Sequence, residues 1–326
     1  MPAPTPSAPS SAASTSAPAL AAERIRRSVV HDVIHTITDP WKPGIVLLLW
    51  LGESRFTGLV NSLAISRSTL TQRLGQLVDD GCVERTGTGA GGDGARAAYR
   101  LTPKGADLLG IVLLNRQWNA RWSGGSRLLP DLKLAHACGA PLSLQMVCRH
   151  CGQEARARDV KVLPTAPPER PGAAPALAPA YRRARNHRAA PAGAPVSGEE
   201  LAGDRWTSLV LAMAFQGLRR NSEIEQAIGI APNILADRLS ALTAQGIFDR
   251  VPYQWSPERH EYRLTPKGLD RYPVILAMML WGQKWLEPRT ALGWNMLHKP
   301  CHEWLSPRLA CRACHGDGHA GSIAAC

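Results

Sequence analysis

Cysteine and histidine residues recur in two groups of the same form along this chain, and residues of these types could bind a metal ion. Each group has a histidine and a cysteine close together, then nine residues, then a Cys-x-x-Cys pair. Three thiolates and one imidazole are the donor set of a closed, tetrahedral, structural zinc site. The sequence therefore predicts two Zn²⁺ sites, one in each group. The predicted ligands are His136, Cys138, Cys148 and Cys151 in the first group, and His298, Cys301, Cys311 and Cys314 in the second.

Two other interpretations of these groups stay open at this point. The cysteines could form a thiol redox switch, or the groups could be structural turns without a metal. Alternative zinc ligands are His150 in the first group and His302, His315 and Cys326 in the second. We keep these alternatives because only one residue separates His136 from Cys138, a tighter spacing than is usual for zinc ligands. Cys82 lies outside both groups and is interpreted as a small buried hydrophobic residue.

The charge of the chain favours a polyanionic partner. Lys and Arg number 38 against 26 Asp and Glu, so the net charge is +12 and the pI is about 9.7, as is common in nucleic-acid-binding proteins. The longest apolar run, Val274–Trp281, is far shorter than the roughly 20 residues that span a bilayer. We therefore expect a soluble, cytoplasmic protein with no membrane partner and reduced cysteines. We expect no enzyme, because no nucleophile elbow, phosphate-binding loop or HExxH array is present.

A long segment of the chain occurs twice. The stretch Tyr99-Arg-Leu-Thr-Pro-Lys-Gly105 returns unchanged as Tyr262-Arg-Leu-Thr-Pro-Lys-Gly268. Further matched pairs, in the same order, are Asp39 and Trp41 with Asp204 and Trp206, Arg73-Leu74 with Arg238-Leu239, Gly81 with Gly246, and Trp118 and Trp122 with Trp281 and Trp285. Chance does not supply so many matches in register, so the chain contains two copies of one domain.

The composition predicts where these copies begin and end. A segment rich in Pro, Ala and Arg lies between them and opposes both helix and sheet, as a tether does. The predicted organisation is a disordered tail over 1–22, a first domain over 23–125, a Cys/His element over 126–159, a linker over 160–200, a second domain over 201–288, and a Cys/His element with a tail over 289–326.

Each copy has the pattern of a winged helix-turn-helix domain. In the first copy, apolar residues at helical spacing predict helices over about 41–49, 55–63 and 67–80. Two short strands over 82–85 and 98–101 then flank a glycine-rich loop, which is the pattern of a β-hairpin wing. A further helix begins at Pro103, where a missing N–H is tolerated. The predicted fold class is mainly α with small β-hairpins (α+β), with two winged helix-turn-helix domains that are each followed by a Cys/His element.

The last helix of each copy has a different pattern from the others. Val274–Trp281 is apolar on all sides, and Ile111–Leu114 in the first copy is similar. A helix that is apolar all round is buried on more than one face. We therefore predict a pairing helix, which packs against its counterpart within the chain or in a second chain.

These motifs resemble the HxlR-type family of winged helix-turn-helix regulators, which are relatives of the MarR type. In the second copy the resemblance lies in Gly203-Asp-Arg-Trp206, Arg219-Arg-Asn-Ser-Glu-Ile224, Leu235-Ala-Asp-Arg-Leu239, Gln245-Gly-Ile247, Arg250, Pro257, Glu261-Tyr-Arg-Leu-Thr265 and Gly268. In the first copy it lies in Trp41, Arg55-Phe56, Leu70-Thr-Gln-Arg-Leu74, Gly81 and the shared heptapeptide. The resemblance covers all of the chain except the tail and the linker.

This resemblance implies a role as a transcriptional regulator, of the repressor kind, that binds double-stranded promoter DNA and has no enzymatic activity. Family members are usually single domains that act as homodimers. The tandem chain is therefore either an intramolecular pseudo-dimer or half of a homodimer with four reading heads. Many members carry a redox-sensing cysteine about thirteen residues before the tryptophan, but Ser28 and Gly193 stand there in this chain. Nothing in the sequence identifies a small-molecule effector.

In such a domain the third helix enters the major groove and the wing lies against the backbone or the minor groove. The predicted DNA-binding residues are Arg67, Ser68, Thr71, Gln72, Arg85 and Arg96 in the first copy, and Asn233, Asp237, Ser240, Arg250, Arg259 and His260 in the second. Arg73 and Arg238 lie beside the apolar stripe, which suits a structural ion pair at least as well as a DNA contact. A winged-helix module for protein interaction is the alternative function, and the acidic Asp237 favours it slightly.

Overall fold

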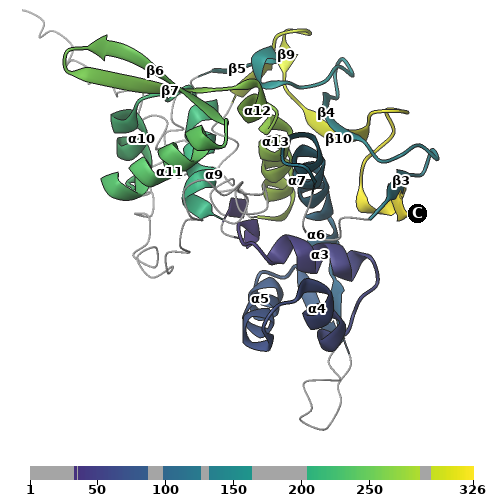
Figure 1. Ribbon diagram of the computed structural model, residues 1–326. Helices are drawn as coiled ribbons and strands as arrows, with labels where there is room; N and C mark the ends of the chain where they lie inside the picture. The colour runs from purple at the N-terminus through teal and green to yellow at the C-terminus, as the bar shows by residue number, and fades with distance from the viewer. Residues whose placement is uncertain (1–32, 35, 87–97, 126–131, 164–203, 287–294) are drawn as a thin grey trace, which may run out of the picture.

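The computed structural model describes residues 33–34, 36–86, 98–125, 132–163, 204–286 and 295–326. We call residues 33–163 the first half and residues 204–326 the second half. The predicted tail over 1–22, most of the predicted linker and the wing residue Arg96 lie outside the described residues. Figure 1 shows the helices α3 to α5 of the first half and α9 to α11 of the second on different sides of a central pair of helices, α7 and α13.

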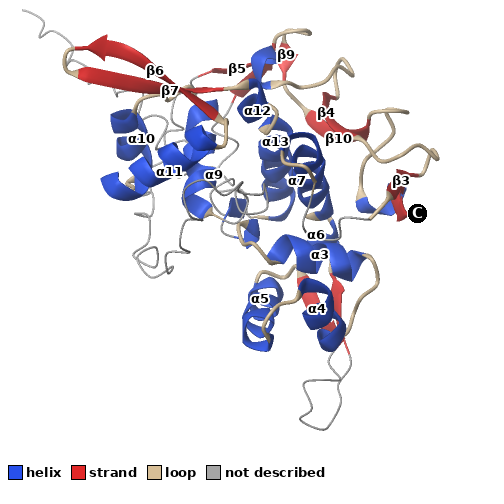
Figure 2. Ribbon diagram, viewed as in Figure 1, coloured by secondary structure: helices blue, strands red, loops and turns tan. Residues whose placement is uncertain are grey.

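The elements of the two halves follow one another in the same order. The first half has α3 (Lys42–Trp50), α4 (Phe56–Leu63), α5 (Arg67–Asp79), β1 (Val83–Thr86), β2 (Ala98–Leu101), α6 (Pro103–Ala106) and α7 (Leu109–Trp122). The second half has α9 (Arg205–Phe215), α10 (Asn221–Ile228), α11 (Pro232–Ala244), β6 (Phe248–Trp255), β7 (Glu258–Leu264), α12 (Pro266–Leu269) and α13 (Tyr272–Trp285). Helices with small antiparallel hairpins, β1–β2 and β6–β7, confirm the predicted fold class (Figure 2).

A buried ion pair attaches the third helix of each half to the start of its first helix. Asp39 accepts hydrogen bonds from the backbone N–H groups of Trp41 and Lys42, and its other oxygen lies 2.5 Å from Arg73 Nε. Asp204 caps α9 by accepting the N–H of Thr207 at 3.0 Å, and the same oxygen lies 2.5 Å from Arg238 Nε. Both guanidinium groups are nearly buried, so the structural interpretation of the two arginines is confirmed.

The apolar stripe of the third helix forms the centre of each domain. Leu70, Leu74 and Leu77 of α5 are at most 1% exposed, and their counterparts on α11, Leu235, Leu239 and Leu242, are fully buried. Cys82 is also fully buried, as predicted, and burial raises the pKa of its thiol to about 11. The stripe settles which face of each third helix is turned outward, because residues three and four apart share one side of a helix.

The predicted pairing helices pack against each other within the chain. The contacts around them are reciprocal, because each half donates the same bonds that it receives. Trp118 Nε1 donates to the carbonyl oxygen of Lys267 at 3.1 Å, and Trp281 Nε1 donates to that of Lys104 at 2.9 Å. Trp122 and Trp285 bind Asp270 and Asp107 in the same exchanged way, at 2.7 and 2.8 Å. The two halves are therefore related by an approximate two-fold axis.

The Cys/His elements consist of short strands, most of which pair across that axis. In the first half they are β3 (Leu134–His136), β4 (Leu144–Cys148) and β5 (Val160–Leu163), and in the second β8 (Asn295–His298), β9 (Glu303–Trp304), β10 (Pro307–Cys311) and β11 (Ile323–Ala325). The pairs β3–β11, β4–β10 and β5–β8 each join one half to the other. Val160–Leu163 was expected to begin the linker, but it forms β5.

One asymmetric pair in the central interface gives a test of this packing. Arg271 is 5% exposed and donates to Asn115 Oδ1 at 2.8 Å, and burial lowers the pKa of its guanidinium to about 10. The two-fold axis relates Arg271 to Leu108 and Asn115 to Met278. Both counterparts are apolar and buried.

Asn115→Met alone is expected to lower the free energy of unfolding by about 1.5–3 kcal/mol, because a buried cation loses its acceptor. The double variant Asn115→Met/Arg271→Leu copies the apolar pair and is expected to match or exceed the wild type, since apolar replacement of buried charge is often stabilising. Urea unfolding of the three proteins measures both effects. A double variant less stable than the single one would contradict the two-fold relation of these positions.

Candidate nucleic-acid interface and metal centres

The outward face of α5 is made of polar side chains. Its helix begins after Ser66, whose hydroxyl accepts the N–H of Thr69 at 3.1 Å. The predicted residues Arg67, Ser68, Thr71 and Gln72 are all exposed on this face. The Thr71 hydroxyl donates to the Arg67 carbonyl at 2.9 Å, and its lone pairs stay available to a donor. The face is therefore a small, continuous polar surface at the N-terminal end of the helix.

The matching face of α11 has a different chemistry. Asn233, Asp237 and Ser240 are exposed, as predicted from the matching register. Pro232 occupies the first turn where α5 has Arg67, so the positive charge at the helix start is missing. An exposed carboxylate repels phosphate, and it suits a base edge only where it accepts from a cytosine amine.

The wing of the second half brings two predicted residues, Arg250 and His260, close together. Arg250 lies opposite Tyr262 on β7, and its Nη2 is 3.0 Å from His260 Nδ1. The other ring nitrogen of His260 is 3.0 Å from a carboxylate oxygen of Glu258. Arg259 is exposed beside them, and in the first half Arg85 is exposed on β1. Both described wings thus present basic side chains.

Sequence reasoning did not single out the aromatic residues of the second wing. Trp255 is 78% exposed at the end of β6, and Tyr253 is 37% exposed with the Arg220 guanidinium 4.4 Å from its ring centroid. Tyr253 and Trp255 alternate along the strand, and this alternation was the signal in the sequence that could have identified them. Large exposed aromatic side chains of this kind suit contact with a partner.

The eight predicted metal ligands gather into two clusters, but each cluster draws on both halves. One cluster is His136, Cys138, Cys311 and Cys314, and the other is Cys148, Cys151, His298 and Cys301. Within each, the potential ligand atoms lie within 4.8 Å of one another. The structure therefore does not support the prediction that each group forms its own site, and metal binding by the eight residues stays a prediction. The cause is the strand pairing across the two-fold axis, which brings each Cys-x-x-Cys pair to the other half's histidine and cysteine.

The histidine of the first cluster is oriented for ligation. His136 Nδ1 is 3.4 Å from Cys314 Sγ, while its Nε2 is 3.1 Å from the carbonyl oxygen of Asp317. A carbonyl acceptor at Nε2 favours the tautomer with the proton there, which leaves Nδ1 unprotonated, as a metal ligand must be, and it accepts the Cys138 N–H at 3.3 Å. In the second cluster, His298 Nδ1 lies 3.3 Å from Cys301 Sγ and 3.4 Å from Cys151 Sγ.

Several thiols of the clusters have a pKa that departs from the ordinary value. The backbone N–H of Ala140 and the ring of His136 lower the pKa of Cys138 to about 7. The alternative ligands His150, His302, His315 and Cys326 are in neither cluster. All eight cysteines of the chain are free thiols. Two clusters of four donors could therefore each hold a metal ion.

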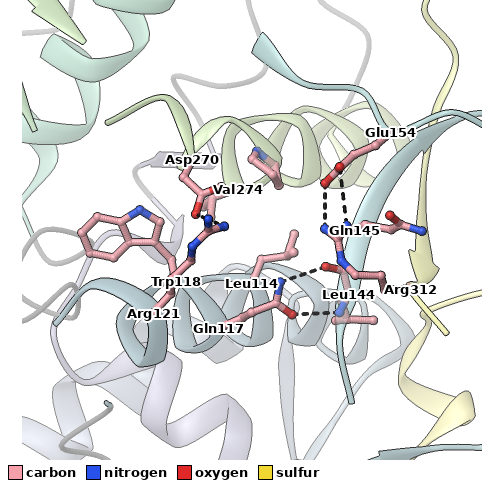
Figure 3. Close-up of a pocket in the computed structure, with 11 residues that line it drawn as sticks. Leu114, Gln117, Trp118, Arg121, Leu144, Gln145, Glu154, Asp270, Val274 and Arg312 are labelled. Carbon is pink, nitrogen blue, oxygen red and sulfur yellow. Dashed lines mark hydrogen bonds and ion pairs between the residues drawn. The ribbon is translucent and has the colours of Figure 1, made fainter. Parts of the chain in front are cut away.

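Next to the clusters, side chains attach the Cys/His elements to the pairing helices (Figure 3). The Gln117 amide of α7 exchanges two hydrogen bonds with the backbone of Leu144, at 2.8 and 2.9 Å. Arg312 of the second half forms a 2.7 Å ion pair with Glu154 of the first. These groups line a cavity of about 50 Å³ between α7, α13 and β4.

The two-fold-related cavity is larger, at about 300 Å³. Leu280 stands there in place of Gln117, and Asp317 in place of Glu154. Arg149, the counterpart of Arg312, lines this cavity with Lys284. The gap between the Cys/His element and the pairing helix is therefore larger on this side of the two-fold axis.

No helix in the described part of the chain combines the length and the apolar character that a bilayer span requires. This finding concerns only the residues whose structure is given above.

Comparison with known proteins agrees with the architecture. A family model described as HxlR-like helix-turn-helix matches residues 36–126 and again 201–290, which together are more than half of the chain. An HTH-type transcriptional regulator of Mycobacterium tuberculosis is 44% identical over 115 residues, covering 35% of this chain and 73% of the relative. The HTH-type transcriptional regulator YodB of Bacillus subtilis is 32% identical over 93 residues, covering 28% and 83%.

One solved structure is similar in sequence to part of the chain. A chain described as a transcription factor from Pseudomonas aeruginosa is 32% identical, covers 36% of this chain and 71% of its own length, and superposes with a TM-score of 0.25.

Proposed function

We propose that this chain, which belongs to the HxlR-like helix-turn-helix family, is a transcriptional regulator that binds promoter DNA sequence-specifically and acts as a repressor. The observation that carries the proposal is the exposed polar face of α5, backed by a fully buried leucine stripe and presented beside a basic wing. The net charge of +12 supports a polyanionic partner. The similar proteins are transcriptional regulators, which supports a role without enzymatic chemistry.

Each exposed residue of α5 has a proposed role in the major groove. Gln72 can form two hydrogen bonds with an adenine, and Ser68 and Thr71 can donate to or accept from base edges. Arg67 at the helix start would bind phosphate. Among the wing residues, Arg85, Arg250, Arg259 and His260 would contact the backbone or the minor groove, and Arg96 stays a prediction for the part of the wing outside the described residues.

The second half is proposed to contribute less of the affinity. On α11, Asn233 and Ser240 could read base edges, but Asp237 repels phosphate and no arginine stands at the helix start. The reciprocal contacts of α7 and α13 support an intramolecular pseudo-dimer, in which one chain occupies both half-sites of an operator. A homodimer with four reading heads is the alternative, and the protein-to-DNA stoichiometry of the complex separates the two. Such a regulator would work in the cytoplasm.

Gln72→Ala is expected to weaken binding to operator DNA by about 10- to 100-fold, because a good bidentate base contact contributes about 1–3 kcal/mol. Fluorescence anisotropy with fragments from upstream of the chain's own coding region, at two salt concentrations, measures the affinity. Asn233→Ala is expected to weaken binding less.

Gln226→Ala is the matched control for Gln72→Ala, since Gln226 is an exposed glutamine on α10, away from the reading face. Equal affinities for Gln72→Ala and Gln226→Ala would contradict the assignment of α5 as the reading helix. If the wild type shows no sequence-preferring binding even at low salt, the chain is instead a protein-interaction module, for which the exposed Trp255 and Asp237 offer contact surface.

For the two Cys/His clusters we propose Zn²⁺ as the bound metal. Three cysteines and one histidine at mutual ligand distances are the donor set that zinc prefers, and four protein ligands leave no open position for catalysis. The purified chain is therefore expected to contain two zinc ions. A thiol redox switch remains the second candidate for these residues, and chains that hold no metal but form disulfides on mild oxidation would favour it.

A further inference from the structure

We propose that the two zinc ions act as clasps between the halves, so that metal binding holds the two reading helices in their mutual arrangement and DNA binding depends on it. The inference rests on the proposed function for its DNA readout and on the proposed zinc for its metal. Its structural basis is the exchange of ligands between the halves, which neither the sequence pattern nor the family resemblance indicates.

Each cluster takes its ligands from both halves. His136 ends β3 and Cys138 follows it, both in the first half, whereas Cys311 ends β10 in the second half. The other cluster reverses this, with Cys148 at the end of β4 and His298 at the end of β8. A tetrahedral site needs all four donors, so neither half can complete a site by itself.

The pairing of β4 with β10 brings these ligands together. In the antiparallel pair β4–β10, Met146 lies opposite Leu309 near the two-fold axis. Cys148 lies opposite Pro307 at one end of the ribbon, and Cys311 lies opposite Leu144 at the other. This ribbon on the axis thus provides one cysteine ligand to each cluster. Because the ribbon contains one strand from each half, it exists only when the halves are docked.

A group that supports a ligand of the first cluster also comes from the opposite half. The carbonyl oxygen that orients His136 belongs to Asp317 of the second half, 3.1 Å from Nε2. The cluster of His136 is therefore completed by the opposite half in a supporting hydrogen bond as well as in its ligands. Such supporting partners fix the ring orientation of a ligating histidine.

The strands that cross between the halves are short, so their own pairing stabilises them weakly. The crossing pair β3–β11 has three paired residues and β5–β8 has four. The two-stranded ribbon β3–β11 is at best marginally stable in water, and β5–β8 gains only the two-residue β9 as a third strand. A metal ion that binds only the folded arrangement adds its binding free energy to folding. Zinc would therefore stabilise the docked state of both Cys/His elements.

The pairing helices connect the clasps to the reading heads. Gln117 binds the Leu144 backbone, so β4 is attached directly to the pairing helix α7. Each pairing helix is followed by a Cys/His element and preceded by a winged domain of its own half. Loosening of the β4–β10 ribbon would thus loosen the frame that sets the spacing of α5 and α11, on which recognition of two half-sites depends.

Paired cysteine substitutions test the exchange of ligands directly. Cys138→Ser/Cys314→Ser alters two ligands of one cluster, taken from different halves. The full-length variant is expected to retain one zinc ion against a competing chelator, where the wild type retains two. Cys138→Ser/Cys148→Ser alters two ligands of the same half but of different clusters. It is expected to retain none, because both sites have lost a ligand.

If each zinc site were instead built within one half, the zinc counts of the two variants would be reversed. The first variant would then lose both tightly held ions and the second would keep one, and this outcome would overturn the proposal. Zinc released from each folded variant, read with a colorimetric chelator, provides the count. Far-ultraviolet circular dichroism of the same samples identifies a variant that has lost its helices.

A second measurement keeps the proposal testable if either variant fails to fold. A protease site is placed between residues 163 and 204 of the full chain, and the chain is cut after purification with zinc. The cut halves are expected to stay associated, and EDTA is expected to raise their dissociation constant at least about tenfold. An unchanged dissociation constant would contradict the clasp.

DNA affinity of the uncut chain completes the experiment. EDTA is expected to weaken operator binding at least about tenfold, because the two half-site contacts are no longer held in register. If zinc counts and the association of the halves behave as described but no DNA binds, the proposed regulator function fails and the clasp stands. If DNA binds equally well without metal, the link from clasp to DNA recognition fails while the regulator function stands.

Discussion

Asp39→Ala is expected to lower the free energy of unfolding by about 3–5 kcal/mol, because it removes one partner of a buried ion pair. The Asp39 and Arg73 side chains are 10% and 12% exposed, so water does not replace the lost carboxylate. Asp39 also accepts the N–H groups of Trp41 and Lys42 at the start of α3. The variant therefore leaves a buried guanidinium unpaired and the first helix uncapped.

Lys42 adds to the expected effect of this substitution. Its residue is 4% exposed, and burial lowers the pKa of its amine, while the charges of Asp80 and Asp39 raise it. Without Asp39 this second buried cation loses part of its compensation. The remaining contacts of the amine are the Thr36 carbonyl at 2.8 Å and Asp80 at 3.7 Å.

Urea unfolding followed by circular dichroism measures the stability of the variant. Asp204→Ala, at the repeated position, is expected to have a smaller effect, since the Asp204 side chain is 28% exposed. Asp237→Ala is the control for removing an exposed acid and is expected to change stability by less than about 0.5 kcal/mol. If Asp39→Ala were as stable as Asp237→Ala, the ion pair would not hold α5 to α3.

Trp281→Ala is expected to lower the free energy of unfolding by about 3–5 kcal/mol, as removal of a buried aromatic side chain does. Trp281 is 3% exposed on α13, where its indole N–H donates to the Lys104 carbonyl of the first half at 2.9 Å. The Lys104 amine also lies 5.5 Å from the centroid of the ring. The substitution thus leaves a cavity in the interface between the halves and an unpaired carbonyl.

Three further variants separate packing from hydrogen bonding at this site. Trp281→Phe keeps an aromatic ring but loses the donor and part of the buried ring volume, so a smaller loss than that of Trp281→Ala is expected. Trp118→Ala, the two-fold counterpart, is expected to resemble Trp281→Ala, because it is also 3% exposed. Trp255→Ala removes an indole that is 78% exposed and is expected to be near neutral. Equal stability of Trp281→Ala and Trp255→Ala would mean that the halves are not packed as described.

The winged domains were predictable because the signals that define them are local. The stripe of Leu70, Leu74 and Leu77 has helical spacing, so any fold that buries it must turn Ser68 and Thr71 outward. The heptapeptide repeated at Tyr99 and Tyr262 predicted the same strand, cap and helix in both halves. The eight potential metal ligands were also predictable, since the same cysteine spacing occurs twice in the chain.

Other features had signals that the sequence pattern left ambiguous. Val160–Leu163 has the alternation of a strand, but the Pro- and Ala-rich residues after it led to its assignment as linker. Arg73 fitted either an ion pair or a DNA contact, because its position beside the stripe does not reveal whether an acid faces it. The contact with Asp39, 34 residues earlier, decided between them.

By itself, the sequence determined the duplication, the winged helix-turn-helix elements and the identity of the potential ligands, because each depends on neighbouring residues or on comparison of one copy with the other. Only the tertiary structure decided which ligands belong together. Two groups with identical donor sets can close locally or exchange partners, and the donor chemistry is the same in both arrangements. The pairing of β4 with β10 across the two-fold axis selects the exchanged one, and a strand's partner is set by contacts between residues far apart in the chain.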